Sequence, residues 1–264
     1  VAALDLYNFA RELSFDVISI GKGKNNPFDT FATPSSLTKE ASLKQMNPKM
    51  LTSFVDGTKT MVEMAALANF LGFNIDIDGM HGIEATYENI NQFYIPKKDG
   101  GLLDESQVVD FAFGIAPGVF AVIYSEDDYV NYEMEYLKMG KGPYWTLARP
   151  YHLTSLEIPR TIRHIMLEKY SKLSAQSWNV EVVAHAKQDI EPGTNLGSIG
   201  GDYIYGKAQK TSSSKGLLPI GIAEDNVVTK AIAKGNPIAI DEVDAQDNEL
   251  CEYWDYQNQI LDSD

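Results

Sequence analysis

The chain has 264 residues, of which 44% are hydrophobic and 22% are charged. This balance excludes a mainly disordered or collagen-like polymer and leaves room for one large domain or two small ones. The formal net charge of −15 argues against a protein that coats nucleic acid or an anionic membrane.

The charge is unevenly distributed. Nine acidic residues and no Lys or Arg lie between Asp241 and Asp264, whereas the first sixty residues contain seven basic and six acidic side chains. A site for a small anionic molecule is therefore compatible with the net charge. We expect it to be locally cationic and to lie toward the N-terminal end.

Cysteine content and hydropathy indicate the compartment. The single cysteine, Cys251, has no intramolecular partner, which is typical of a reducing compartment. The sequence shows no signal peptide and no apolar run of 18 residues, so we expect a cytoplasmic protein. The chain starts at Val1 without a Met and opens directly into a helical pattern, so we also expect an upstream segment to have been removed.

The first part of the chain predicts alternating helices and strands. Helical spacing of apolar residues over 4–13 precedes a strand over 15–20, and a loop with two glycines and two lysines follows over 21–27. A capping-box pattern at Thr60 predicts a helix over 61–71 that ends at Gly72.

Two further strands and a helix complete the predicted first domain. The strands cover 108–113 and 118–124, and the second is a nearly continuous apolar run typical of a strand buried on both faces. The segment 126–137 fits a helix or a strand, and a helix is predicted over 159–170. Together these elements predict an α/β (α+β) catalytic and dimerisation domain with a mixed sheet over residues 1–174.

The pattern then changes to short runs rich in Gly, Pro, Val and Ile. These predict a small, mostly β domain over 175–245, followed by an acidic tail over 246–264. The predicted strands and the three predicted turns are 180–186, 199–206, 217–223 and 238–243, and 192–193, 200–201 and 235–236. Residues 209–216 predict a flexible loop, and 186–193 weakly resembles 229–235, each with an Ile-centred segment and a Gly turn.

No complete motif for nucleotides or metals is present. The segment that starts at Gly21 lacks the third glycine of a dinucleotide fingerprint and the Ser or Thr of a P-loop. The segment that starts at Asp76 has its glycine misplaced for a calcium loop and carries Tyr87 at the twelfth position. The four histidines show no metal-ligand spacing.

A set of polar residues in glycine-rich loops and at a helix start forms the candidate site. Cations and a helix N-terminus both favour negative charge, so this set fits an oxyanion or phosphate substrate. The candidate residues are Lys22, Lys24, Asn25, Asn26, Asp56, Thr58, Lys59, His81, Arg149 and His152.

Each candidate also has a plainer interpretation. A lysine pair in a loop is more often solvated surface than a catalytic group. Lys59 and Glu63 lie four residues apart and could form a helix-surface ion pair worth about 0.3 to 0.5 kcal/mol. His81 and His152 could be hydrogen-bonded structural residues.

Six strings resemble a family of homoserine dehydrogenase-like oxidoreductases with a C-terminal SAF domain, of the 1-deoxy-D-xylulose 5-phosphate reductoisomerase-like type. They are GKGKNNP (21–27), MNPKMLTSFVDGTKTMVEMA (46–65), GMHG (79–82), APGVF (116–120), YLKMGKGP (136–143) and RPYHL (149–153). The resemblance implies a catalytic part to about Ser174, an SAF-like β-clip domain after it, and a homodimer. It also implies an N-terminal Rossmann domain that this chain lacks, so the chain alone is expected to be inactive.

The resemblance implies roles for the candidate residues. Lys22, Lys24, Asp56 and Lys59 would be catalytic, whereas the candidate Asn, Thr, His and Arg side chains would bind a phosphorylated or carboxylated substrate. The implied cofactor is NAD(P)H, bound mainly outside this chain, and a divalent Mg or Mn ion is conceivable. Alternatives are a dehydrogenase of another hydroxy acid or sugar acid, and a non-enzymatic SAF-domain module for binding or oligomerisation.

Overall fold

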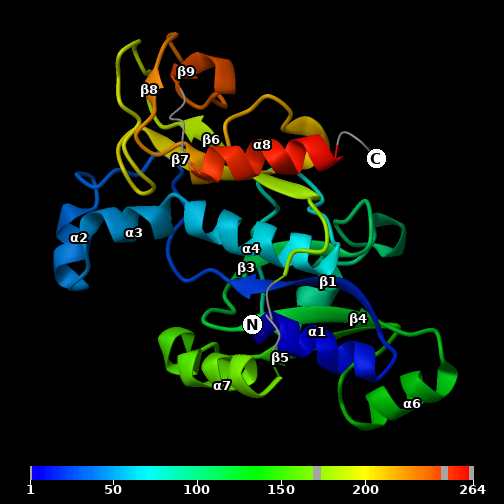
Figure 1. Cartoon of the computed structure of the whole chain (residues 1–264). Helices are drawn as coiled ribbons and strands as arrows, with labels where there is room; N and C mark the ends of the chain where they lie inside the picture. Colours follow the sequence, from blue (N-terminus) through cyan, green and yellow to red (C-terminus); the bar gives the residue numbers. More distant parts are fainter. Residues whose placement is uncertain (1, 169–173, 245–248, 262–264) are drawn as a thin grey trace. The chain divides into compact units, whose positions relative to one another are not determined.

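The computed structural model describes residues 2–168, 174–244 and 249–261 (Figure 1). Their contacts divide the chain into two compact units, each assembled from two stretches. The first unit contains Val1–Asn25 and Glu63–Val180, and the second contains Asn26–Val62 and Glu181–Asp264. No helix among the described residues has the length and apolar character needed to cross a membrane.

These units differ from the predicted domains in one respect. Residues 26–62, predicted to belong to the first domain, group with the C-terminal part of the chain. The predicted domain boundary at 174 stays a prediction, and the predicted start of the acidic tail at 246 lies outside the described residues.

The first unit is built on a mixed five-stranded sheet with the order β2-β3-β1-β4-β5. The central strand β1 runs parallel to β3 and antiparallel to β4, and this confirms the predicted α/β class with a mixed sheet. The strands are β1 (Asp16–Gly23), β2 (Ile83–Glu84), β3 (Val108–Phe113), β4 (Val119–Tyr124) and β5 (Tyr144–Arg149).

Helices of the first unit carry the segments between these strands. The predicted first helix is confirmed, and it contacts β1, β4 and β5. The ambiguous segment after β4 is a helix capped by Asp127, whose side chain accepts hydrogen bonds from two backbone N–H groups. The helices are α1 (Ala2–Glu12), α4 (Thr58–Leu71), α5 (Ile90–Phe93), α6 (Asp128–Tyr136), α7 (Ile158–Glu168), and the 3-10 turns η1 (Lys97–Asp99) and η2 (Thr154–Glu157). Of α4, only the part from Glu63 onward belongs to this unit.

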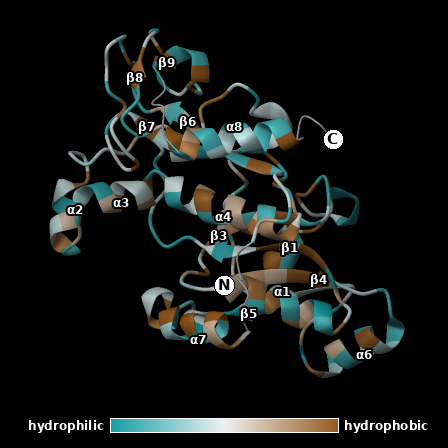
Figure 2. Cartoon of the chain, in the orientation of Figure 1, coloured by the Kyte–Doolittle hydropathy of each residue, from teal (hydrophilic) through white to brown (hydrophobic). Residues whose placement is uncertain are grey.

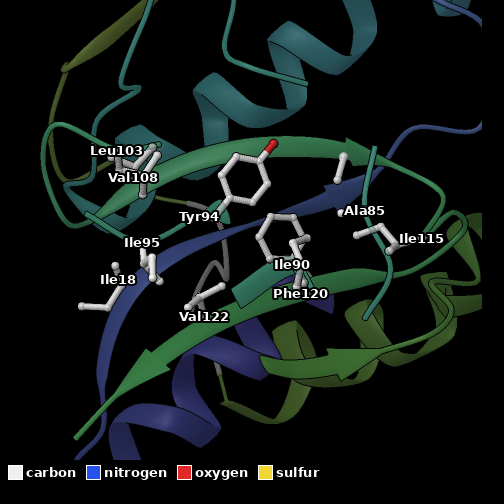
Figure 3. Packing of buried hydrophobic residues seen from close by; sticks show 11 residues of the cluster. Ile18, Ala85, Ile90, Tyr94, Ile95, Leu103, Val108, Ile115, Phe120 and Val122 are labelled. Carbon is white, nitrogen blue, oxygen red and sulfur yellow. The ribbon is translucent and has the colours of Figure 1, made fainter. Parts of the chain in front are cut away.

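A hydrophobic cluster fills one face of this sheet (Figure 3). Tyr94 from the end of α5 stacks on Phe120 of β4, with ring centroids 5.4 Å apart and an interplanar angle of 6°. Strand β4 is coloured mainly as hydrophobic in Figure 2, and its first five residues are buried. The predicted burial of this strand on both faces is therefore confirmed.

The second unit combines two short helices with small β elements. Asn47 caps α3 by accepting hydrogen bonds from the backbone N–H groups of Lys49 and Met50. A small cluster of Ala32, Ala41, Leu51 and Val55 forms beside α2 and α3. The elements are α2 (Thr38–Leu43), α3 (Pro48–Val55), β6 (Val180–Ala186), β7 (Ile204–Lys210), β8 (Val227–Val228), β9 (Val243–Asp244), α8 (Glu249–Leu261), and the 3-10 turns η3 (Thr211–Ser213), η4 (Ile220–Ile222) and η5 (Ile240–Glu242).

Several predicted strands of the C-terminal part are wrong in extent. β6 has the predicted bounds, but β7 begins five residues later than predicted and extends into the predicted flexible loop. The runs 217–223 and 238–243 contribute mainly single bridges and 3-10 turns, including the bridge between Leu217 and Ala239. Only Val243, at the end of the second run, belongs to a strand, β9. Short apolar runs of this kind pair over one or two residues, which periodicity alone does not reveal.

Candidate active site

Lys22 lies within strand β1 and not in the predicted loop. The strand continues through Gly21 and Gly23, where neighbouring backbone approaches closely. A Cβ atom on Gly21 would lie 1.7 Å from the carbonyl oxygen of Asp110, and one on Gly23 would lie 2.4 Å from the backbone nitrogen of Ala116. These glycines allow neighbouring backbone to pack closely against β1. Lys22 lies between them and is therefore held on a rigid strand.

The register of the sheet places two predicted site residues on one face. Lys22 of β1 pairs with Val119 of β4, and Val119 pairs with Arg149 of β5. Residues paired across strands point to the same face of a sheet. The side chains of Lys22 and Arg149 therefore project from the same face of the sheet, two strands apart.

A cavity of about 400 Å³ lies over this face of the first unit. Its polar side chains include Lys22, Glu63 of α4 and His152, which follows β5. The ammonium group of Lys22 donates a hydrogen bond to the Glu63 carboxylate, and the side chains are 14% and 48% exposed, respectively. The rest of the wall is largely apolar and is formed by Ala2, Ala3, Leu4, Met64, Leu67, Val119 and Ile158.

His152 is held as an uncharged base beside this pair. Its backbone N–H donates to the carbonyl oxygen of Pro117 at 3.0 Å. Burial lowers the pKa of His152, and the nearby Lys22 ammonium lowers it further, against an opposing effect of Glu63. The imidazole is therefore neutral at neutral pH and can accept a proton.

Ion pairs close one side of the cavity. Arg149 donates to Glu157 of η2 and, at 3.4 Å, to Asp5 of α1. Arg160 of α7 also donates to Asp5, at 2.6 and 3.0 Å. The backbone N–H of Leu153 and the guanidinium of Arg149 lower the pKa of Glu157, so this carboxylate stays charged. Arg149 is thus already bound by two carboxylates, and its predicted contact with the substrate stays a prediction.

His81 belongs to a different cluster of the first unit. Its Nδ1 lies 3.0 Å from Asp110 Oδ2, and its Nε2 lies 3.4 Å from Asp76 Oδ2. Asp110 pairs in register with Gly21, and successive residues of a strand alternate between faces, so Asp110 starts from the face opposite Lys22. His81 therefore does not line the Lys22 cavity, and its expected substrate-binding role stays a prediction.

Asp56 and Thr58 are buried within the second unit. The Asp56 carboxylate lies 2.8 Å from the ammonium group of Lys187, with side-chain exposures of 0% and 1%. It also accepts a hydrogen bond from the backbone N–H of Thr58 at 2.9 Å, at the start of α4. The Thr58 hydroxyl accepts from the backbone N–H of Gly206 at 2.8 Å. α4 begins at Thr58, three residues earlier than predicted, where the Asp56 carboxylate accepts from the first backbone N–H of the helix.

Lys59 and Asn26, two other residues predicted for the site, contact side chains outside the cavity. The ammonium of Lys59 lies 4.5 Å from the ring centroid of Phe54, and Glu63 pairs with Lys22. Lys44 donates to the side-chain oxygen of Asn26 at 3.2 Å. Lys24 is buried and Asn25 is exposed, directly after β1. The catalytic and binding roles expected of these residues, as of Asp56 and Thr58, stay predictions.

Two carboxylates at the cavity were missed in the sequence. The local sequence pattern predicts a surface ion pair between Glu63 and Lys59 and singles out no role for Glu157. Both are brought to the cavity by tertiary contacts with Lys22 and Arg149, which no local pattern encodes. Within the described parts of the chain, no group of three His, Cys, Asp or Glu side chains is arranged to hold a metal ion.

Comparison with known proteins identifies the family. The family described as "Oxidoreductase DRL, catalytic domain" matches residues 1–158. This range includes β1 to β5 and the residues that line the cavity, apart from Thr161 of α7. No curated protein matches the chain. Because the match covers more than half of the 264 residues, the chain belongs to the oxidoreductase DRL catalytic-domain family.

Proposed function

We propose that the chain supplies the substrate-side groups of an NAD(P)-dependent oxidoreductase that interconverts a hydroxyl and a carbonyl group. One observation carries the proposal, namely that Lys22, Glu63 and His152 meet in one cavity of the matched catalytic domain. A hydrogen-bonded cation and a neutral imidazole are the groups that such a reaction needs at the reacting oxygen.

The cavity fits the ring of a nicotinamide and not the rest of the dinucleotide. Met64, Leu67 and Ile158 provide an apolar wall on which a flat ring can lie. The sequence contains no glycine-rich strand–turn–helix that could bind a pyrophosphate. When bound, the nicotinamide would give or take the hydride, and the groups of this chain act on the substrate oxygen and its proton.

Each polar residue of the cavity would have a separate role in the reaction. Lys22 donates a hydrogen bond to the reacting oxygen and stabilises the negative charge that develops on it. Glu63 binds Lys22 and so fixes the direction of its ammonium group. His152 accepts the hydroxyl proton during oxidation and returns it to the carbonyl oxygen during reduction.

Two of the substrate classes expected from the sequence fit this chemistry. One is a phosphorylated sugar, as for reductoisomerase-like enzymes, and the other is a hydroxy acid or sugar acid. The family match supports an enzyme over a module that only binds or assembles. An SAF-like second domain and a homodimer complete the proposal, both on the strength of the sequence resemblance alone.

The test uses the protein at its natural full length with a panel of hydroxy and oxo compounds, followed by the absorbance of the nicotinamide. Lys22→Met and His152→Gln should each lower kcat/KM by about 10²-fold or more, as for loss of a positioned charge or proton-transfer group. Lys138→Met is the matched control, because Lys138 lines a different cavity.

The pH profile separates the two roles. In the oxidation direction, kcat/KM should fall as the pH falls through the lowered pKa of His152, because the protonated imidazole cannot accept a proton. His152→Gln should lose this limb and Lys22→Met should keep it. Normal turnover in both variants would refute the assignment.

A further inference from the structure

We propose that a second cavity of the first unit binds a short peptide with a free amino terminus and a free carboxyl terminus. This cavity has a volume of about 800 Å³ and is lined by residues of α5, η1, the loop over 137–143 and the start of β5. Its Thr146 lies three residues before Arg149 on β5, and successive residues of a strand alternate between faces. Thr146 therefore projects from the face of the sheet opposite the Lys22 cavity, and the site is separate from the proposed catalytic one.

Four charged side chains of this cavity lack an opposite charge. Lys138 and Lys141 come from the loop, Glu88 precedes α5, and Asp99 belongs to η1. Within the part of the chain that the structure describes, none of the four forms an ion pair at 4.0 Å or less. The cavity thus keeps two cations and two anions too far apart to pair directly. A ligand that carries both charges can pair with both sets.

The loop is suited to bind the carboxylate of such a ligand. The backbone N–H groups of Gly140, Lys141 and Gly142 donate no hydrogen bond within the described residues, and Lys141 adds an ammonium group to this segment. The indole N–H of Trp145 donates to the Gly140 carbonyl oxygen at 3.3 Å. A Cβ atom on Gly142 would lie 1.9 Å from the side-chain oxygen of Asn131. These close contacts hold the loop in a conformation that presents several donors to one anion.

The segment around α5 is suited to bind the ammonium group. A hydrogen bond from Thr86 lowers the pKa of Glu88, so this carboxylate is charged at neutral pH. Asp99 Oδ2 accepts from the Tyr144 hydroxyl at 2.7 Å, which leaves Oδ1 to accept from a ligand. The side-chain nitrogen of Asn91 donates to the Tyr144 carbonyl oxygen at 2.9 Å, and its oxygen is left as a further acceptor.

The size and lining of the cavity favour a peptide over a single amino acid. An amino acid carries both charges on one carbon, whereas the ends of an extended tripeptide are separated by up to about 10 Å. A cavity of about 800 Å³ has room for a ligand of this length. Asn91 and Gln92 offer amide groups for the peptide backbone, and Tyr87 and Ile95 offer apolar surface for its side chains.

The test compares trialanine with two blocked forms of the same peptide on the 264-residue chain at about pH 7. N-acetyl-trialanine lacks the cation, and trialanine amide lacks the anion. A free amino terminus has a pKa of about 8, so it is mainly protonated at this pH. Binding is measured from the methyl signal of Met139 in ¹³C-methyl-methionine NMR, assigned with Met139→Leu. Met64, which lines the Lys22 cavity, provides the control signal.

We expect trialanine to bind about fivefold or more tightly than either blocked form or free alanine, because charge-assisted hydrogen bonds are the stronger ones. Lys141→Met should weaken the binding of trialanine about fivefold and leave that of trialanine amide unchanged. Glu88→Gln should weaken trialanine similarly and leave N-acetyl-trialanine unchanged. Both side chains are exposed, so the variants should keep the fold, which an unchanged Met64 signal verifies. Lys98→Met, at a third cavity, is the matched control.

The inference is overturned if a blocked peptide or alanine binds as tightly as trialanine, or if no peptide moves the Met139 signal. It is also overturned if Lys141→Met and Glu88→Gln weaken all the peptides equally. Lys22→Met should leave trialanine binding unchanged, because Lys22 lies on the other face of the sheet. Peptide binding and turnover are therefore tested independently, and the failure of one does not affect the other.

Discussion

At the scale of a single residue, His81 lies between two buried carboxylates, those of Asp76 and Asp110. Asp110 has no exposed side-chain surface and accepts hydrogen bonds from the His81 backbone, the Gly82 backbone and the Tyr94 hydroxyl. The Asp76 side chain is also buried, and its Oδ2 atom accepts no hydrogen bond within the described residues. The nearest donor that protonation could supply is His81 Nε2, which lies 3.4 Å away. An imidazole protonated on both nitrogens therefore satisfies both carboxylates at once.

This arrangement predicts a pH-dependent stability. The hydrogen bond that His81 donates to the Asp110 carboxylate raises the pKa of His81, with a further contribution from Asp76 and opposition from burial and Lys97. Since the folded pKa lies above the unfolded value of 6.5, the stabilisation is fully present below that value and is lost as the pH rises through the folded pKa.

Chemical unfolding of the wild type and His81→Gln across this pH range measures the effect. At low pH the variant should lose about 3 kcal/mol, as expected for removing one partner of a buried ion pair, and the difference should narrow as the pH rises. His164→Gln, on the exposed helix α7, is the control. A constant difference between wild type and His81→Gln would show that the imidazolium charge does not contribute.

At the scale of elements, strand β1 determines where Lys22 and its cavity lie on the sheet. Its Lys22 stands in a row of residues in register that continues through Val119 to Arg149. The row depends on the close approach of β3, which only a glycine at position 21 permits. The close backbone approach at Gly21 thus determines where the Lys22 side chain leaves the sheet.

Gly21→Ala should destabilise the protein strongly. The added Cβ would lie 1.7 Å from the Asp110 carbonyl oxygen and 3.0 Å from the Phe120 ring, so β1 and β3 must separate. We expect a loss of about 3 kcal/mol in the free energy of unfolding, measured by chemical denaturation. Gly221→Ala, whose Cβ meets nothing within 4 Å, should change it by less than about 1 kcal/mol. Equal effects would mean that the sheet can widen at β1 without cost.

The weak internal similarity of the second unit also becomes clear at this scale. Ile190 and Ile232, one from each similar segment, form an antiparallel bridge with hydrogen bonds of 2.8 and 2.9 Å. The glycines that follow them, Gly193 and Gly235, have φ values of 88° and 84°. The two segments are thus related in both pairing and turn conformation.

At the scale of the whole molecule, the net charge of −15 describes the surface and not the site. Part of the acidic C-terminal stretch forms helix α8, whereas the charges at the Lys22 cavity are balanced in pairs. Glu63 and Glu157 come to the cavity from segments distant in sequence, and the expectation of a locally cationic site stays a prediction.

The binding of the cofactor is also a property of the whole molecule. Because the sequence has no glycine-rich turn for a pyrophosphate, NADPH should bind the 264-residue chain with a Kd no tighter than about 1 mM. Fluorescence of the reduced nicotinamide, recorded while the chain is titrated into NADPH, measures this Kd. Micromolar binding would reveal a dinucleotide site built from other residues of this chain.

The sequence by itself determined the local elements and the class of the fold. Helix α1 and strands β3 and β4 could be predicted because apolar periodicity and continuous apolar runs reflect burial along one segment. Lys22 could be singled out as a lysine in a glycine-containing segment after a predicted strand, and Arg149 and His152 by their residue type after a Gly-rich turn.

Only the tertiary structure decided which of these residues act together. It paired Lys22 with Glu63, gave Asp56 to Lys187, and separated His81 from the cavity by the thickness of the sheet. The physical reason is that strand register and helix packing depend on contacts between distant segments. A shift of one residue in β1 would turn Lys22 to the opposite face without any change in local pattern.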